Sequence, residues 1–186
     1  MRKVFATTFV TLDGVMESPN EWNPLFWSEE AEKYKREELF ATDALLLGRK
    51  TYEGFAAAWP TMTDEDGFAD RMNSLPKYVV SSTLEKLEWN NADLLKRDFM
   101  KEVQSLKREP GQDIAIHGSG ELVNSLMQHD LIDELHMMIF PIVLGQGERL
   151  FESHETSTAL KLIETKKLPN GVIVLHYEAD RNKNKG

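Results

Sequence analysis

The 186-residue chain contains no cysteine. Disulfide bonds, catalysis by a thiolate and zinc sites with cysteine ligands are therefore excluded. Secreted domains often rely on disulfides, whereas proteins of a reducing compartment do not. The missing cysteine therefore predicts a cytoplasmic protein.

An excess of positive charge is also missing, because the formal net charge at pH 7 is −9. Nucleic acids and anionic membranes are bound mainly by clusters of lysine and arginine, so we expect neither as a partner. A small anionic ligand is compatible with this charge, since a few well-placed cations are sufficient to bind it.

Long hydrophobic runs are absent as well, and none approaches the roughly 20 residues that a membrane-spanning helix needs. The apolar N-terminal segment is short, contains Thr7 and Thr8, and leads into Asp13-Gly14 without a cleavage site of small residues. It therefore predicts a first β-strand rather than a signal peptide. With 41% hydrophobic residues, the chain can bury the core of one domain.

Several short runs are rich in aliphatic or β-branched side chains and end at glycine, serine or proline, which is typical of buried strands. Helices are expected between them, one with Ser28 as its N-cap and others at residues 98–108 and 121–128. The predicted strands are residues 4–11, 44–47, 78–80, 114–116 and 135–144.

The C-terminal part predicts a β-hairpin, because the apolar segments 160–163 and 172–175 flank Pro169-Asn170-Gly171. Strands that alternate with helices predict a three-layer α/β domain, in which helices cover both faces of a mostly parallel central sheet. The hairpin adds antiparallel strands to it. We expect a single domain over residues 1–180 and a frayed polar tail at residues 181–186.

Two strand-to-helix turns match places where α/β proteins bind phosphate groups. In the first, a buried strand ends at Gly48-Arg49-Lys50-Thr51. Glycine lets the backbone approach a ligand, free amides and the Thr51 hydroxyl can bind phosphate oxygens, and Arg49 can make two hydrogen bonds to a phosphate. A capped turn with solvated cations explains the same residues without a ligand.

The second turn is Gly118-Ser119-Gly120, which leads into a helix. Two glycines and a serine at a helix start can form an anion-binding site from backbone amides. The third glycine of the dinucleotide fingerprint is missing, since Val123 occupies its position, and no acidic residue follows at the ribose-binding distance. A standard Rossmann fold is therefore not indicated, and the turn alone is equally consistent with a tight connection.

Ser81-Ser82-Thr83 adds hydroxyl groups at the end of a third strand. By itself this cluster is explained by a turn or a helix cap. Its combination with the two glycine turns favours a dinucleotide, and the cations Arg49 and Lys50 favour one with a 2′-phosphate. These residues together predict NADPH as the cofactor.

The order of these motifs resembles the dihydrofolate reductase superfamily over about residues 2–178. Within it, the chain resembles the C-terminal reductase domain of the bifunctional deaminase-reductases of riboflavin biosynthesis and their free-standing homologues. The stretches typical of that branch are residues 131–135 and 140–147, the second with the pattern Pro-x-x-Leu-Gly-x-Gly. No deamination is expected, because the cysteine ligands of the deaminase are absent.

The resemblance implies which residues contact NADPH. The two glycine turns would hold its phosphates, Ser81 and Ser82 would flank the adenosine ribose, and Thr11 and Gly14 would lie beside the nicotinamide. Folate reductases have Gly-Gly with a cis peptide in the second turn, and Gly118-Ser119 leaves the isomer in this chain open. The complete implied set is Thr11, Gly14, Gly48, Arg49, Lys50, Thr51, Ser81, Ser82, Gly118, Ser119, Gly120, Glu121 and Leu122.

The resemblance also implies candidates for catalysis. When Tyr34-Lys35-Arg36 is aligned with the family, Glu30 takes the place of the carboxylate that grips the pterin ring in folate reductases. Asp13 is the rival candidate, because it would lie near the nicotinamide. An acidic residue such as Glu30 at a helix start is equally explained by the helix dipole.

Three aromatic residues, Trp22, Trp27 and Tyr34, are candidates to stack on a flat substrate, and each is equally explained as a core residue. Lys33 and Arg36 are the nearest cations for a substrate phosphate. The five histidines show no metal-ligand spacing, so we predict no metal site.

We therefore predict an NADPH-dependent reductase that transfers hydride to a small heterocycle, similar to 5-amino-6-(5-phosphoribosylamino)uracil reductase. The alternatives are a nucleotide-binding domain without turnover, a reductase of a pteridine or of dihydrofolate, and a mononucleotide binder. The relatives that the motifs suggest also imply a homodimer.

Overall fold

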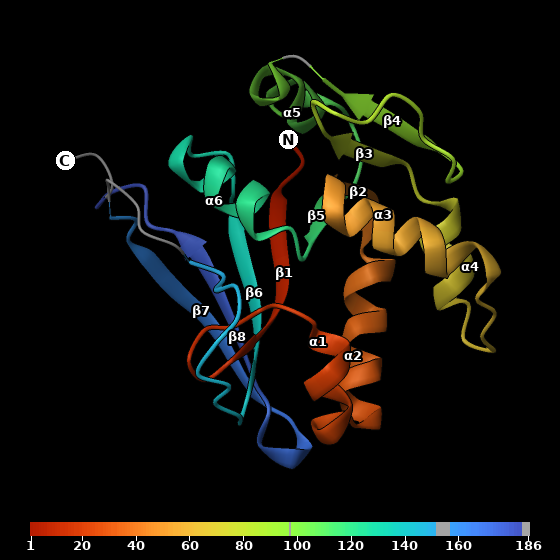
Figure 1. Ribbon diagram of the computed structural model, residues 1–186. Coiled ribbons are helices and arrows are strands. Elements are labelled where there is room, and N and C mark those ends of the chain that lie inside the picture. Colours follow the sequence, from red (N-terminus) through yellow and green to blue (C-terminus); the bar gives the residue numbers. More distant parts are fainter. Residues whose placement is uncertain (97, 152–156, 184–186) are drawn as a thin grey trace.

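The computed structural model of the protein describes residues 1–96, 98–151 and 157–183. In this part of the chain eight strands form one sheet with the order β4-β3-β2-β5-β1-β6-β8-β7 (Figure 1). The strands are β1 (Val4–Thr11), β2 (Thr42–Gly48), β3 (Lys77–Val80), β4 (Ala92–Leu95), β5 (Asp113–His117), β6 (Glu134–Phe140), β7 (Leu160–Lys167) and β8 (Ile173–Ala179). The helices are α1 (Pro19–Trp22), α2 (Glu29–Phe40), α3 (Arg49–Ala58), α4 (Phe68–Ser74), α5 (Phe99–Arg108) and α6 (Gly120–Gln128), with short 3₁₀ helices at Asn23–Phe26, Trp59–Thr61 and Pro169–Gly171.

The sheet is parallel from β4 to β6, and β8 and β7 complete it in antiparallel orientation. β7 and β8 form the predicted hairpin, whose turn holds Asn170 and Gly171 at φ angles of 60° and 84°. Asn and Gly tolerate these positive angles, which explains why they form the turn. The predicted α/β class and its C-terminal antiparallel hairpin are confirmed.

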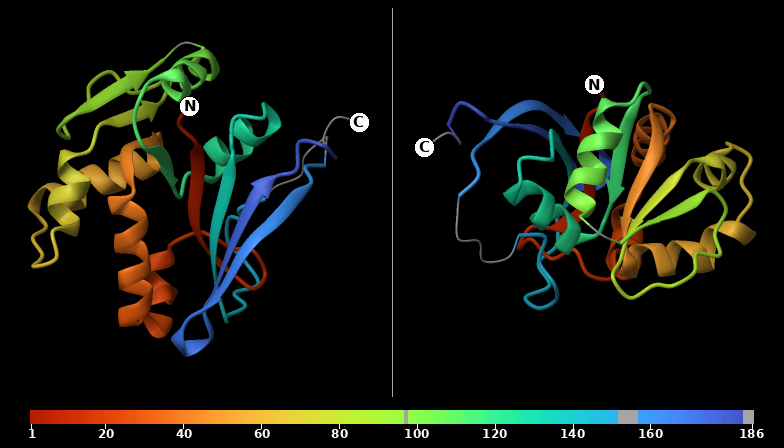
Figure 2. Two further views of the ribbon diagram at one scale, coloured as in Figure 1. Left: turned by 180° about the vertical axis from the view of Figure 1, so that it is seen from behind. Right: turned by 90° about the horizontal axis from the view of Figure 1, so that it is seen from above.

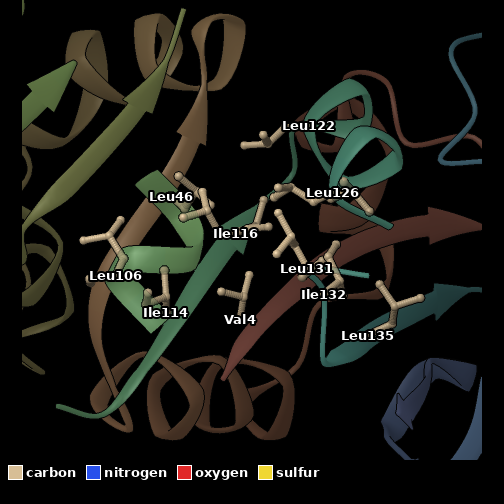
Figure 3. Close-up of a cluster of buried hydrophobic side chains, with 14 of the residues drawn as sticks. Val4, Leu46, Leu106, Ile114, Ile116, Leu122, Leu126, Leu131, Ile132 and Leu135 are labelled. Atoms are coloured by element: carbon tan, nitrogen blue, oxygen red, sulfur yellow. The ribbon is translucent and has the colours of Figure 1, made fainter. Parts of the chain in front are cut away.

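Helices cover both faces of the sheet (Figure 2). Successive side chains of a strand point to opposite faces, and β1 shows the consequence. Val4 and Ala6 belong to an aliphatic cluster with residues of α5 and α6, part of which Figure 3 shows. Phe5 belongs to a second cluster, formed with residues of α2, α3 and α4. The three layers therefore follow from the alternation along buried strands.

Several elements differ from the sequence-based prediction. The strand predicted at residues 135–144 ends at Phe140, because Pro141 has no N–H to donate to the sheet. The following residues, 141–149, form a loop. β4 and α4 are not indicated by the sequence pattern, since both are short and contain acidic residues.

Asp133 connects three distant parts of the fold at the start of β6. Its carboxylate accepts hydrogen bonds from the Val4 N–H at 2.8 Å and the Arg181 guanidinium at 2.6 Å, and it pairs with Lys107 of α5. The side chains of Lys107 and Asp133 are only 7% and 15% exposed, so water compensates little for loss of this pair. Arg181 is thus anchored rather than frayed, and residues 184–186 of the predicted tail lie outside the described residues.

Asp133→Ala should lower the free energy of unfolding by about 3 kcal/mol, because it leaves the buried Lys107 ammonium without a counter-charge. Urea denaturation followed by circular dichroism measures the change. Asp93→Ala at an exposed position of β4 is the control and should change stability by less than about 0.5 kcal/mol. Equal stabilities of the two variants would contradict the connecting role of Asp133.

Candidate functional site

A large groove lies where β2, β3 and β5 end. These strands are parallel, so their carboxyl ends meet at one edge of the sheet. The groove measures about 810 Å³, within the usual range of small-molecule sites. The predicted cofactor residues that line it are Gly48, Arg49, Lys50, Thr51, Ser81, Ser82, Ser119, Gly120, Glu121 and Leu122.

The remaining predicted cofactor residues, Thr11, Gly14 and Gly118, are not among those that line the groove, and their contact with a cofactor stays a prediction. Thr11 is buried at the end of β1, where its hydroxyl bonds Asp13. Thr83 of the predicted hydroxyl cluster lines the groove as well. The groove also contains residues that sequence reasoning missed: Met16, Glu17, Val80, Leu95, Lys96, Phe99, Ser125, Glu148 and Arg149.

The two glycine turns are joined through Ser119. Its hydroxyl accepts a hydrogen bond from the Gly48 N–H at 2.9 Å and donates one to the Thr51 hydroxyl at 2.8 Å. Gly118 and Ser119 both have a φ angle of 56°, and the peptide bond between them is trans. This left-handed pair turns the chain sharply from β5 into α6. Ser119 thus holds the starts of α3 and α6 side by side.

The starts of these two helices suit a phosphate-bearing ligand. Their N-cap residues, Gly48 and Ser119, make no side-chain capping hydrogen bond. The first N–H groups of a helix have no partner inside the helix, and the helix dipole adds partial positive charge there. Backbone donors from two helices, with nearby hydroxyls, therefore fit a pyrophosphate.

Cations of the groove are available to a ligand. Arg49 pairs with Glu53 at 3.0 Å and Lys50 pairs with Glu148 at 3.1 Å, but both pairs are solvent-exposed and therefore weak. Lys96 follows β4 directly, and it lies beside Ser81 because Val80 and Leu95 are paired across the two strands. The sequence pattern missed Lys96 because it missed β4.

Asp13 anchors the loop of residues 141–149. Its carboxylate accepts hydrogen bonds from the Thr11 hydroxyl at 2.6 Å and the Gly145 N–H at 2.8 Å. These hydrogen bonds lower the pKa of Asp13 to about 2. A carboxylate that stays ionised and is already hydrogen-bonded is a poor proton donor, so this geometry favours an anchoring role over the predicted catalytic one.

A second cavity of about 380 Å³ lies between α2, α3 and α4 and is rich in aromatic side chains. Trp27 lines it, as a substrate-binding residue should. Trp22 instead packs on Phe140 with the ring centres 5.2 Å apart, and the buried Tyr34 bonds His176 through its hydroxyl at 2.7 Å. The complete lining is Phe9, Trp27, Glu32, Lys35, Arg36, Phe55, Trp59, Asp64, Asp66, Phe68, Met72 and His117.

Glu30, the predicted carboxylate for the substrate ring, is exposed and is not among the residues that line either cavity. Lys33 is exposed as well, and of the two predicted phosphate-binding cations only Arg36 lines the aromatic cavity. The α2 residues that line the cavity are Glu32, Lys35 and Arg36. Lys35 and Arg36 lie three and four residues after Glu32 and flank its face of the helix, whereas Glu30 lies about 140° around the helix from Lys35. The position of Glu30 therefore gives no support to its predicted role.

His117 is a candidate residue that sequence reasoning did not select. It ends β5 and lines the aromatic cavity, and its Nε2 is buried without a hydrogen-bond partner. Burial, and secondarily the charge of Lys35, lowers the pKa of His117 to about 3, so the ring is neutral near pH 7. A buried polar atom without a partner is costly, and a bound molecule could supply the missing hydrogen bond.

Neither a membrane-spanning helix nor a metal site is found among the described residues. No helix in this part of the chain has the length and apolar character needed to cross a membrane. No three side chains of the metal-binding types come together within it to form a metal site.

The chain was compared with known proteins. Residues 2–174 match the model of the RibD C-terminal domain family. The uncharacterized protein YyaP of Bacillus subtilis (strain 168) is 29% identical over 182 residues, which cover 95% of this chain and 94% of the relative.

Solved structures share the fold. A protein of Shewanella sp. PV-4 assigned to riboflavin biosynthesis has a TM-score of 0.77 at 20% identity, with 96% of this chain and 99% of that chain covered. Dihydrofolate reductase from Enterococcus faecalis in complex with NADP(H) has a TM-score of 0.60 at 15% identity, with 96% of both chains covered. The family match spans nearly the whole sheet and both glycine turns, and the chain therefore belongs to the RibD C-terminal domain family.

Proposed function

We propose that the protein is an NADPH-dependent reductase of a small heterocyclic substrate. The observation that carries this proposal is that α3 and the segment from His117 to Ser119 supply residues to both the phosphate-suited groove and the aromatic cavity. Thr51 and Phe55 of α3 line the groove and the cavity respectively, and His117 of the cavity stands two residues before Ser119 of the groove. The RibD C-terminal domain family supports reductase chemistry, and the NADP(H) bound by the Enterococcus faecalis enzyme supports the cofactor.

The groove offers partners for the phosphate groups of the dinucleotide. The backbone amides at the starts of α3 and α6, with the Thr51 hydroxyl, would bind the pyrophosphate. Arg49 and Lys96 flank the serines at the end of β3 and would bind the 2′-phosphate. When bound, the dinucleotide supplies a hydride, and the protein contributes positioning and exclusion of water.

The aromatic cavity suits a flat, polar ring. Trp27, Phe55 and Trp59 present aromatic faces, and the buried Nε2 of His117 offers a hydrogen bond at the edge. Arg36 supplies a cation for a phosphate group. The first substrate to test is therefore 5-amino-6-(5-phosphoribosylamino)uracil, a pyrimidine that carries a ribose phosphate.

Fluorescence titration with NADPH and with NADH tests the cofactor. NADPH should bind more tightly, and Arg49→Ala should weaken NADPH binding by about tenfold, because it removes a charged hydrogen-bond donor to the 2′-phosphate, while NADH binding changes little. Arg108→Ala, an exposed residue of α5 outside the groove, is the control. Absence of binding of both dinucleotides would refute the proposed function.

His117→Phe tests the cavity as the substrate site. The variant keeps an aromatic ring but loses Nε2, so the Kd for 5-amino-6-(5-phosphoribosylamino)uracil should rise about tenfold, the cost of one buried hydrogen bond. The Kd for NADPH should stay unchanged. The histidine is neutral well above its pKa of about 3, so its contribution to binding should not change between pH 5 and 8, about two units or more above that pKa. Isothermal titration calorimetry measures these values, and an unchanged substrate Kd would exclude Nε2 as a contact.

A further inference from the structure

The face of α2 that packs on the sheet carries a buried ion pair. The side chains of Lys35 and Glu38 are 8% and 6% exposed and form a salt bridge, and the Lys35 ammonium also donates to the Thr7 hydroxyl of β1 at 2.6 Å. Burying two charges costs solvation free energy that apolar side chains would not cost. Such a pair at the wall of a cavity is a candidate for chemistry.

His136 of β6 extends this pair. Its Nδ1 lies 2.8 Å from a Glu38 oxygen and its Nε2 lies 3.2 Å from a Glu134 oxygen. Ionised carboxylates only accept hydrogen bonds, and both ring nitrogens donate only when the ring is protonated, so this geometry favours the protonated form. Burial lowers the pKa of His136, but the hydrogen bonds to Glu134 and Glu38 outweigh burial and leave that pKa above its usual value.

Other polar groups surround the cluster from every neighbouring element. Tyr34 of α2 donates to Glu38 at 3.2 Å, and the ring of His176 of β8 stacks on His136 with the centres 4.1 Å apart. Glu164 of β7 lies 3.6 Å from His176. Lys3 bonds Glu134 at 2.6 Å on the solvent side.

Lys35 reaches the aromatic cavity at the other end of the cluster. It lines that cavity, and its ammonium lies 5.6 Å from the centre of the Phe9 ring, which lines it too. Its charge acts on His117, the histidine whose Nε2 lacks a partner. Arg36 is the neighbouring cation, but a guanidinium does not give up its proton in proteins. Lys35 is therefore the cation of this cavity that can act as an acid.

We propose that Lys35 donates the proton that accompanies hydride transfer, with Glu38 and Thr7 as positioning residues and His136 as the compensating charge. This inference rests on the proposed function. The hydride forms a C–H bond at the electrophilic carbon of a C=N or C=O group, and the π electron pair moves to the heteroatom. The heteroatom takes a proton from the Lys35 Nζ, which becomes a neutral amine. Lys35 regains a proton from water after the product leaves.

The protonated His136 makes this proton loss less costly. A neutral Lys35 no longer compensates the Glu38 carboxylate, which would then be a buried charge without a partner. His136 keeps its positive charge 2.8 Å from that carboxylate, so the buried cluster still contains a matched pair. The arrangement thus tolerates both protonation states of Lys35.

Lys35→Arg is the central test. Arginine keeps the positive charge and can still bond Glu38 and Thr7, but it cannot give up its proton. With NADPH and 5-amino-6-(5-phosphoribosylamino)uracil, the single-turnover rate of hydride transfer should fall at least about 100-fold, while the Kd for NADPH stays unchanged. Lys33→Arg, an exposed lysine of the same helix outside the cavity, should match the wild-type protein.

A second variant separates chemistry from folding. In Lys35→Ala the space of the side chain becomes free, and added methylamine should restore the rate in proportion to its concentration. Methylammonium would also replace a purely structural cation beside Glu38, so a proton donor is shown by a rescued rate that changes with the pKa of the added amine, and a rate independent of that pKa would contradict the proposal. A wild-type rate in Lys35→Arg would overturn the proposal. Absence of NADPH binding and turnover in the wild-type protein would instead refute the proposed function.

One readout needs neither cofactor nor substrate. In Lys35→Met the Glu38 carboxylate loses its cation, so the pKa of His136 measured by NMR titration should rise, whereas Lys35→Arg and Lys33→Met should leave it near the wild-type value. An unchanged pKa in Lys35→Met would show that Lys35 and His136 are not coupled and would overturn the compensating role.

Discussion

The parallel register of β1, β5 and β2 is the constraint on which both cavities depend. Ile116 of β5 is paired with Ala6 of β1 on one side and Leu46 of β2 on the other. The turns that follow β2 and β5 therefore reach the same height, where the Ser119 hydroxyl joins them. A shift of one residue would move every side chain to the opposite face and separate these groups.

The same register places the chemistry of the aromatic cavity. Thr7 is paired with His117, so the partner of the Lys35 ammonium stands beside the histidine of the cavity. Along β6, His136 is paired with Thr7 on the other side of β1. Three neighbouring strands thus present polar side chains to α2 at one level of the sheet. The pairing of the strands, and not the local sequence, therefore brings the groups of this charged cluster together.

The two faces of the sheet serve different purposes. The face under α5 and α6 is aliphatic and stabilises the fold, as Figure 3 shows for residues such as Ile114 and Leu126. The opposite face buries Lys35, Glu38 and His136 beneath α2, which costs solvation free energy. The two stretches typical of the family, residues 131–135 and 140–147, lie at the two ends of β6. Asp133 fixes the start of this strand, and Asp13 holds the loop of residues 141–149 that follows it.

The sequence by itself determined the α/β class, the hairpin around Asn170-Gly171 and the turns at Gly48 and Ser119. These features depend on local patterns, namely buried strands, turn residues and helix starts. The part of the groove lining that follows β2, β3 and β5 could be predicted because parallel strands end at one edge. The short β4, and Lys96 after it, left no pattern of their own.

Only the tertiary structure decided the surroundings of Asp13, Glu30, Lys35 and His117. Whether a carboxylate anchors a loop or meets a substrate depends on groups that are distant in sequence, such as the Gly145 N–H near Asp13. Helix rotation turned Glu30 to solvent and Lys35 to the sheet, and the burial of the His117 Nε2 depends on α2 and α3 closing over β5. Side-chain environments of this kind are set by packing between elements, which a local pattern does not contain.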